Sequence, residues 1–245
     1  MKYIYFDCYA GFDVQMALGS LIDMSENKDL AKKAGAAVFG EVTLFTQEVK
    51  RQSMEALLAY FDFPYPDEQD IGEFIEKSEL SEEIKTKLRL WQKVKSDGRK
   101  HNFIEEIREL ACCAACLELI DSIGADEVYV SAIYQGAPGG NAPSDHTRLL
   151  CKMADILTYP APCEKEILTP GGAALLYVLG AKHMGPGAHD VIKSGYGAGE
   201  EILSMPNIVR CIFAGKNDLE ELNLNFEALI SDMCAEIGAL AKTGK

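Results

Sequence analysis

The chain has 245 residues, of which 48% are hydrophobic and 25% are charged, and this composition is ordinary for a globular protein. Its 24 basic and 38 acidic side chains give a formal net charge of −14, which argues against a sequence-independent grip on nucleic acid and against an anionic membrane surface as partner. The sequence shows neither a long apolar run nor a signal-peptide pattern, so we expect a cytoplasmic protein whose eight cysteines are thiols.

The first part of the chain predicts a small α+β unit. Residues 3–6, YIYF, are β-branched or aromatic and favour a strand. Apolar positions at helical spacing over 14–24 predict a helix. Residues 37–49 and 57–63 predict two more strands, after which two prolines close the unit.

A helical segment follows in the middle of the chain. Ser81 stands before two glutamates, which is typical of a helix N-cap, and this helix is expected to run to Lys95. A longer helix is predicted over 102–123, with Gly124 as its C-terminal stop. Residues 127–134, EVYVSAIY, predict a strand.

The last part alternates loops, helices and strands. Residues 136–145 predict a loop and 147–157 a short helix, Thr169 caps a further helix, and 207–214 predict a strand. We therefore predict an α+β fold with a mixed sheet, packed helices and a helical middle segment. The predicted parts are an N-terminal α+β unit over 1–66, a helical and ligand-binding part over 67–215, and an acidic helical tail over 216–245.

Two interpretations stay open for the polar residues around the first loop. Asp7, Cys8 and Asp13 lie at or after the end of the first strand, where α/β folds place ligands, and two carboxylates with a thiolate can hold a divalent metal. The alternative is a turn in which the Asp7 side chain accepts hydrogen bonds from backbone amides. His146, beside an aspartate and after a glycine-rich loop, is a further metal candidate, with a solvated histidine as the simpler interpretation.

Three cysteines, Cys112, Cys113 and Cys116, lie within one turn of the long predicted helix. Such a face can bind a soft metal. Leucine and alanine neighbours favour the other interpretation, which is that these are small apolar side chains in a tightly packed core.

Two glycine-containing motifs suggest an anion site. The stretch KSGYGAGEE places Gly195, Gly197 and Gly199 around Tyr196, and glycines allow close backbone approach to a ligand. The helix that starts at Thr169 continues with Gly171 and Gly172, and its N-terminal amides suit a phosphate. We expect the two segments to face each other around a phosphate, with the tyrosine stacked on a ring; tight packing is the alternative for both.

Several stretches occur together in one order, namely DCYAG, MALGSLID, ILTPGGAALL, SGYGAG, MPNIVRCIFAG and the final NFEALISDM. In this order and spacing the chain resembles the LarC nickel-insertion proteins over most of residues 1–236. It departs from the family pattern at Gln15, where the family carries an aspartate, although Asp13 lies two residues earlier.

The resemblance implies a nickel-inserting chelatase of the lyase class that acts on a pyridinium bis-thiocarboxylic acid mononucleotide, maturing the nickel-pincer cofactor of lactate racemase-type enzymes. It implies nickel as the metal, and CTP with Mg²⁺ or Mn²⁺ supplied through a missing or separate C-terminal domain. A separate C-terminal half is thus an expected partner, and a homo-oligomer stays open. The alternative is a non-catalytic nucleotide-binding relative, or a partner-dependent subunit, that has lost nickel handling.

Overall fold

The computed structural model describes residues 1–64, 70–96, 102–136, 145–160, 166–185, 187 and 189–215. The helices are α1 (Val14–Ser25), α2 (Lys28–Phe39), α3 (Ile71–Lys77), α4 (Glu82–Lys95), α5 (Phe103–Ile123), α6 (Asp145–Met153) and α7 (Pro170–Val178). The strands are β1 (Lys2–Cys8), β2 (Thr43–Arg51), β3 (Met54–Asp62), β4 (Glu127–Val130), β5 (Ile133–Tyr134), β6 (Thr158–Tyr159), β7 (Lys182–His183), β8 (Asp190–Ala198) and β9 (Ile208–Gly215).

Seven of these strands form one mixed sheet in the order β2-β3-β8-β9-β1-β4-β7. Strand β1 pairs parallel with β4, and β4 pairs parallel with β7, so the carboxyl ends of these three strands meet at one edge. The pairs β2–β3, β8–β9 and β9–β1 are antiparallel. Strands β5 and β6 form a separate parallel pair beyond the end of β4. The predicted α+β fold with a mixed sheet is confirmed.

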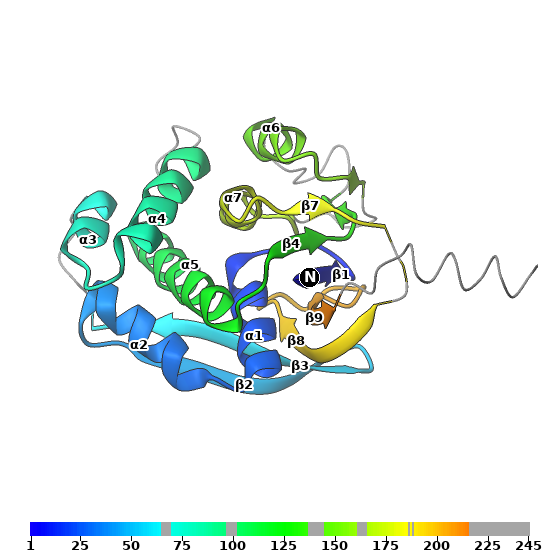
Figure 1. The fold of residues 1–245 in the computed structure, drawn as a ribbon, viewed down its shortest axis with the longest axis horizontal. Helices are drawn as coiled ribbons and strands as arrows, with labels where there is room; N and C mark the ends of the chain where they lie inside the picture. Colours follow the sequence, from blue (N-terminus) through cyan, green and yellow to red (C-terminus); the bar gives the residue numbers. More distant parts are fainter. Residues whose placement is uncertain are drawn as a thin grey trace, which may run out of the picture.

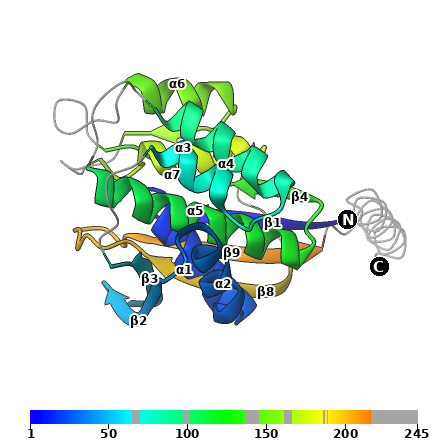
Figure 2. The same cartoon turned by 90° about the vertical axis from the view of Figure 1, so that its left-hand side faces the viewer.

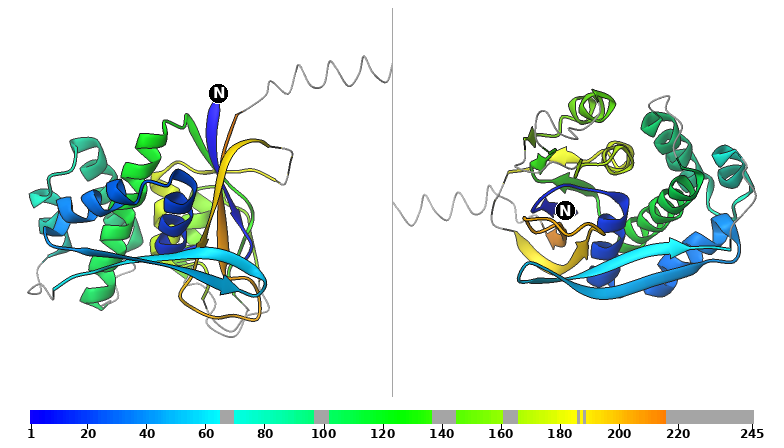
Figure 3. Two further views of the ribbon diagram at one scale, coloured as in Figure 1. Left: turned by 90° about the horizontal axis from the view of Figure 1, so that it is seen from below. Right: turned by 180° about the vertical axis from the view of Figure 1, so that it is seen from behind.

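The core lies between the sheet and the helices. Helix α1 packs against β3, β8 and β9, and α5 packs on α1 and α2, so α1 is enclosed between strands and helices (Figure 1). Helix α4 lies beside α5 and also contacts α7, and α6 covers α7 (Figure 2). The β2–β3 hairpin extends past β8 until β2 contacts α2 (Figure 3). None of the helices in the described ranges is long and apolar enough to cross a membrane.

Local capping signals explain where the best-predicted helices start and end. The Ser81 hydroxyl accepts a hydrogen bond from the Ile84 amide at 3.3 Å, and α4 then runs to Lys95 as predicted. Helix α5 ends at Gly124, which has a φ of 67° in the left-handed region that glycine favours. These boundaries are set by neighbouring residues, so the sequence alone reveals them.

The predicted strand over 37–49 starts too early, because its first residues end a helix. Helix α2, which was not predicted from the sequence, runs to Phe39 and stops at Gly40, whose φ of 75° breaks the helix, and β2 begins only at Thr43. The predicted strand over 127–134 is divided into β4 and β5.

The predicted parts 1–66 and 67–215 share the main sheet, because β3 from the first pairs with β8 from the second. A domain boundary at residue 66 therefore stays a prediction, and strands from both sides of it belong to one sheet. The predicted tail over 216–245 and most of the loop over 136–145 lie outside the described residues.

Candidate functional site

The loop after β1 and the start of α7 lie in direct backbone contact, although about 155 residues separate them in the chain. The Phe12 amide donates to the Ile167 carbonyl at 2.8 Å, and the Thr169 amide donates to the Phe12 carbonyl at 3.2 Å. A Cβ added to Gly172 would lie 2.4 Å from the Phe12 oxygen, so only glycine fits there. The structure thus joins two of the predicted motifs at one place.

A cavity of about 150 Å³ opens where these two segments meet. Asp13 and Gln15 from the start of α1 line it, together with Thr169 from the start of α7. The other lining residues come from the segment before α7 and from the connection between β8 and β9: Glu166, Ile167, Glu200, Glu201, Leu203 and Asn207. Four of the lining side chains are carboxylates and none is a lysine or arginine, so the cavity favours a cation over a phosphate.

Asp13 caps a helix and has a raised pKa. Its carboxylate accepts a hydrogen bond from the Met16 amide at 2.6 Å and so caps α1. Burial raises the pKa of Asp13 to about 6, an effect that the Met16 hydrogen bond opposes and that the nearby charges of Glu109 and Glu200 reinforce. Asp13 is the one predicted metal ligand that lines this cavity.

The start of α7 offers few amides to an anion. Pro170 carries no N–H, and the Gly172 amide already donates to the Thr169 hydroxyl at 3.1 Å. Of the first three helical positions, this leaves the amide of Gly171. The Gly171 carbonyl accepts from the Trp91 indole at 3.0 Å, which fixes this turn against α4.

The predicted glycine loop is a strand, and its glycines face α1 and not α7. Gly195 and Gly197 belong to β8, which packs on α1. A Cβ at Gly197 would lie 1.9 Å from the Met16 carbonyl oxygen, and one at Gly195 would lie 2.2 Å from the Met24 amide. The expected convergence of these glycines on the helix at Thr169 is therefore wrong, because close strand–helix packing uses them.

Tyr196 and Gly199 have different surroundings. The Tyr196 side chain lies on the other face of β8, where its ring centroid is 5.7 Å from the Arg210 guanidinium. The backbone amide of Tyr196 donates to Asp23 of α1 at 2.7 Å. Gly199 follows β8, and its carbonyl accepts from Arg51 at 2.7 Å. Its neighbours Glu200 and Asn207 line the acidic cavity, so only this end of the glycine motif reaches the site.

The structure does not bring the four predicted metal ligands together. Asp7 and Cys8 are consecutive in β1 and point to opposite faces, Cys8 into the core below α1. Burial raises the pKa of the Cys8 thiol far above its usual value, so it stays protonated. The His146 ring donates to the Val94 carbonyl at the end of α4. Within the described part of the chain, no three His, Cys, Asp or Glu side chains are placed to hold one metal ion.

The three cysteines of α5 are core residues. Cys112, Cys113 and Cys116 are fully buried among apolar side chains, and burial raises the pKa of each thiol. Packing, the interpretation favoured by their leucine and alanine neighbours, agrees with this burial.

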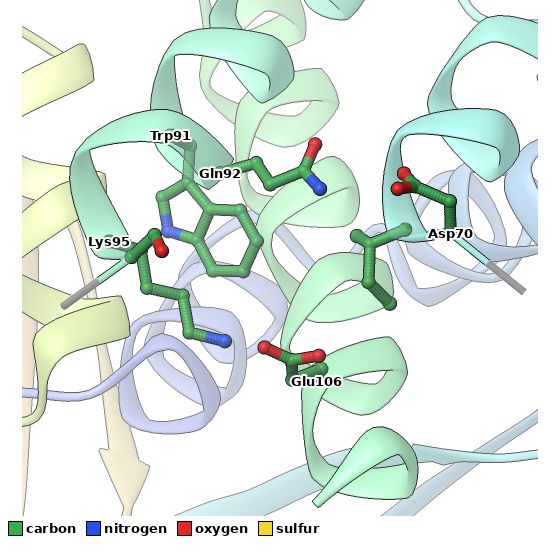
Figure 4. Close-up of a pocket in the computed structure, with 7 residues that line it drawn as sticks. Asp70, Trp91, Gln92, Lys95 and Glu106 are labelled. Atoms are coloured by element: carbon green, nitrogen blue, oxygen red, sulfur yellow. The ribbon is translucent and has the colours of Figure 1, made fainter. Parts of the chain in front are cut away.

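A second cavity, of about 310 Å³, lies between α3, α4 and α5 (Figure 4). Trp91 and Lys95 line it from α4, and Lys95 points its amino group toward the α5 side of the cavity. That amino group pairs with the Glu109 carboxylate at 2.5 Å, with only 10% of the lysine and 24% of the glutamate side chain exposed. A Cβ at Gly171 would lie 2.8 Å from this carboxylate, so the ion pair packs directly against the first turn of α7.

Comparison with known proteins agrees with this arrangement of motifs. The family model of nickel insertion proteins matches residues 4–242. The chain belongs to this family. A pyridinium-3,5-bisthiocarboxylic acid mononucleotide nickel insertion protein of Desulfitobacterium hafniense is 27% identical over 86% of this chain and 58% of its own length. The protein of the same name from Staphylococcus saprophyticus is 26% identical, over 85% of this chain and 59% of its own.

A relative from Dictyoglomus thermophilum is 25% identical, over 97% of this chain and 67% of its own length. The chain thus spans 58 to 67% of the length of these nickel insertion proteins. No solved structure gives a significant match.

The acidic surroundings of Asp13 were not predicted from the sequence. Glu200 and Glu201 stand at the end of the glycine motif, and their charges were the available signal that this edge suits a cation. The Lys95–Glu109 pair has no comparable signal, because its members lie on two helices whose packing the sequence does not state.

Proposed function

We propose that this chain inserts nickel into a pyridinium bis-thiocarboxylic acid mononucleotide, as the names of its relatives state for those proteins. The family match over residues 4–242 supports the proposal. The observation that assigns the proposed function to particular residues is the acidic cavity between the starts of α1 and α7, which Asp13 lines.

The cavity suits delivery of a cation better than its permanent storage. Carboxylate oxygens attract Ni²⁺ by charge, but sulfur and nitrogen donors bind such a metal more tightly. The thiocarboxylate groups of the substrate offer sulfur donors, so a metal held by Asp13 and a neighbouring carboxylate can pass to them. Nickel is in this scheme a substrate, and Asp13 and Glu200 are its proposed contacts in the chain.

The residues predicted to bind the nucleotide fall into two groups, which are proposed substrate contacts and packing residues. Thr169 remains a proposed contact for the substrate because it lines the acidic cavity, and Gly171 remains one because its amide is left unused in the same first turn of α7. Gly195 and Gly197 are assigned to packing. CTP with Mg²⁺ or Mn²⁺ and a separate C-terminal half stay predictions from the resemblance, and a homo-oligomer stays open. A cytoplasmic location is supported by the six cysteines of the described part, which are all buried free thiols.

Nickel transfer by purified protein tests the proposal. The chain is loaded with Ni²⁺, mixed with the bis-thiocarboxylic mononucleotide, and nickel in the small-molecule fraction is measured by mass spectrometry after ultrafiltration. Asp13→Asn keeps a side chain that can cap α1 but removes the charge, and we expect transfer to fall by at least about tenfold, the effect of about 1.4 kcal/mol.

Asp29→Asn is the matched control, because Asp29 is an exposed aspartate in the first turn of α2. Equal transfer by Asp13→Asn and Asp29→Asn would remove Asp13 from the mechanism. Binding of the mononucleotide without any nickel transfer by the wild-type chain would instead support the alternative, which is a non-catalytic relative or a partner-dependent subunit.

A further inference from the structure

A third cavity, of about 570 Å³, lies among α6, the β5–β6 pair and β7. Its volume falls within the range of about 300–1,000 Å³ that is usual for small-molecule sites. Arg148 and Lys152 from α6 line it together with His183, the last residue of β7, and Thr158 of β6. Nothing in the proposed nickel chemistry uses these residues.

The charge of this cavity is opposite to that of the whole chain. Arg148 and Lys152 are one turn apart on α6, and Asp155 is the one acidic side chain among the lining residues. Arg148 has a weak pairing, 3.5 Å from Asp145, whose side chain is fully exposed. In a protein with a net charge of −14, a concave surface with two cationic side chains is a place where an anion is attracted and not repelled.

A buried polar atom without a partner points to the same place. The Nδ1 atom of His183 is buried and has no hydrogen-bond partner within the described structure. Buried polar groups are usually satisfied, so this unpartnered atom marks His183, which lines the cavity, as a side chain whose hydrogen bonds the described protein does not complete. A phosphate oxygen accepts from a histidine N–H, from a guanidinium and from an ammonium group.

The position in the fold is also that of a ligand site. His183 pairs in register with Val130, so it marks the common carboxyl edge of the parallel strands β1, β4 and β7, where α/β folds bind ligands. The Tyr134 amide of β5 donates to the Ala10 carbonyl, in the loop that leads from β1 to Asp13. The basic cavity and the acidic cavity are thus both connected to the loop after β1.

We infer that the basic cavity binds a phosphate monoester, with Arg148, Lys152 and His183 as its contacts. The inference rests on the proposed function for the identity of the ligand, because a pyridinium mononucleotide carries such a phosphate. It rests on charge, burial and position for the site itself.

Calorimetric titration of the full chain, without nickel, tests the site. The probes are nicotinamide mononucleotide, which is a pyridinium ribose phosphate, nicotinamide riboside, which lacks the phosphate, and inorganic phosphate. We expect the mononucleotide to bind at least about tenfold more tightly than the riboside, and raising KCl from about 50 to about 500 mM to weaken it. Inorganic phosphate should compete with the mononucleotide.

The variant Arg148→Ala/Lys152→Ala should bind the mononucleotide at least about tenfold less tightly. The control Lys32→Ala/Lys33→Ala removes the same charge from exposed positions on α2 and should bind within about twofold of wild type. Lys152→Gln, which removes the charge but keeps a long polar side chain, should show a smaller loss and guards against misfolding of the double variant. Urea unfolding of every variant provides the folding control.

Three results would overturn the inference: no binding by the wild type, equal binding of mononucleotide and riboside, or equal binding by the double variant and the α2 control. The outcome is separable from nickel transfer. Normal mononucleotide binding by the double variant, in a chain that transfers nickel, removes this site and leaves the proposed function. Phosphate-dependent binding in this cavity by a chain that transfers no nickel does the reverse.

Discussion

Gly197 offers the sharpest test of how the glycine motif works. A Cβ at this position would meet three backbone atoms of α1, at 1.9 Å from the Met16 oxygen, 2.5 Å from the Ser20 amide and 2.9 Å from the Met16 carbonyl carbon. Opposite it, a Cβ on Gly19 of α1 would lie 3.2 Å from the Gly197 Cα. Backbone cannot rotate away as a side chain can, so Gly197→Ala requires α1 and β8 to separate.

The expected cost follows from this geometry. Overpacking costs typically about 1–3 kcal/mol, and three backbone clashes place this substitution at about 3 kcal/mol. Alanine restricts the unfolded chain more than glycine does, which returns about 0.4–1 kcal/mol because Gly197 has no positive φ. The net loss is about 2 kcal/mol or somewhat more, and the melting temperature should fall by roughly 4–8 °C for a chain of this size.

Urea unfolding followed by circular dichroism measures this loss. Gly185→Ala is the matched control, because a Cβ there meets nothing within 4 Å and the substitution should change stability by less than about 0.5 kcal/mol. Unfolding midpoints that agree between Gly197→Ala and Gly185→Ala would refute the packing argument. Loss of mononucleotide binding with an unchanged midpoint would restore a ligand role for the glycines.

Three further predictions concern the surroundings of the site. The pKa of Asp13 is about 6 in the folded chain against about 3.9 in the unfolded chain, so the folded state binds the proton of this carboxyl more tightly. The wild type should therefore lose stability to urea, relative to Asp13→Asn, as the pH rises from about 4 to about 6, and this difference should stay constant above about pH 6. Lys95→Met should cost about 1–3 kcal/mol by leaving the partly buried Glu109 without its partner, and the second substitution Glu109→Leu should recover most of this loss in a double-mutant cycle. Cys113→Ala/Cys116→Ala should cost roughly 2 kcal/mol in urea unfolding and leave the nickel content, measured by mass spectrometry, unchanged.

Elements with local signals could be predicted from the sequence. Helices α4 and α7 start at Ser81 and Thr169 because these side chains bond their own first turns, and a bond within a few residues is visible in the sequence. Strand β1 has a continuous aromatic and β-branched run that suits a central strand. Strands of two residues, such as β7, have no pattern long enough to recognise.

The glycine motif could not be interpreted correctly from the sequence, because the feature that explains it lies elsewhere in the chain. Glycine density favours a loop when only neighbouring residues are taken into account. In the fold, Gly195 and Gly197 allow the backbone of α1 to approach β8. No pattern in the sequence near residue 195 indicates that α1 is the element packed there. The arrangement of two metal candidates was hidden for a related reason, since Asp7 and Cys8 are neighbours in sequence but point to opposite faces of a strand.

Under the two proposals, the charges at the edge of the sheet give the acidic and the basic cavity different tasks. A pyridinium mononucleotide has a cationic ring and an anionic phosphate, and the incoming nickel is a further cation. One cavity could not attract both a phosphate and a divalent cation by charge alone, because the field that gathers one repels the other. The structure places carboxylates around Asp13, cationic groups around His183, and connects both cavities to the loop after β1. Holding the phosphate away from the carboxylates would let them attract the metal, and this division would explain why the motif that first suggested a phosphate site ends in two glutamates.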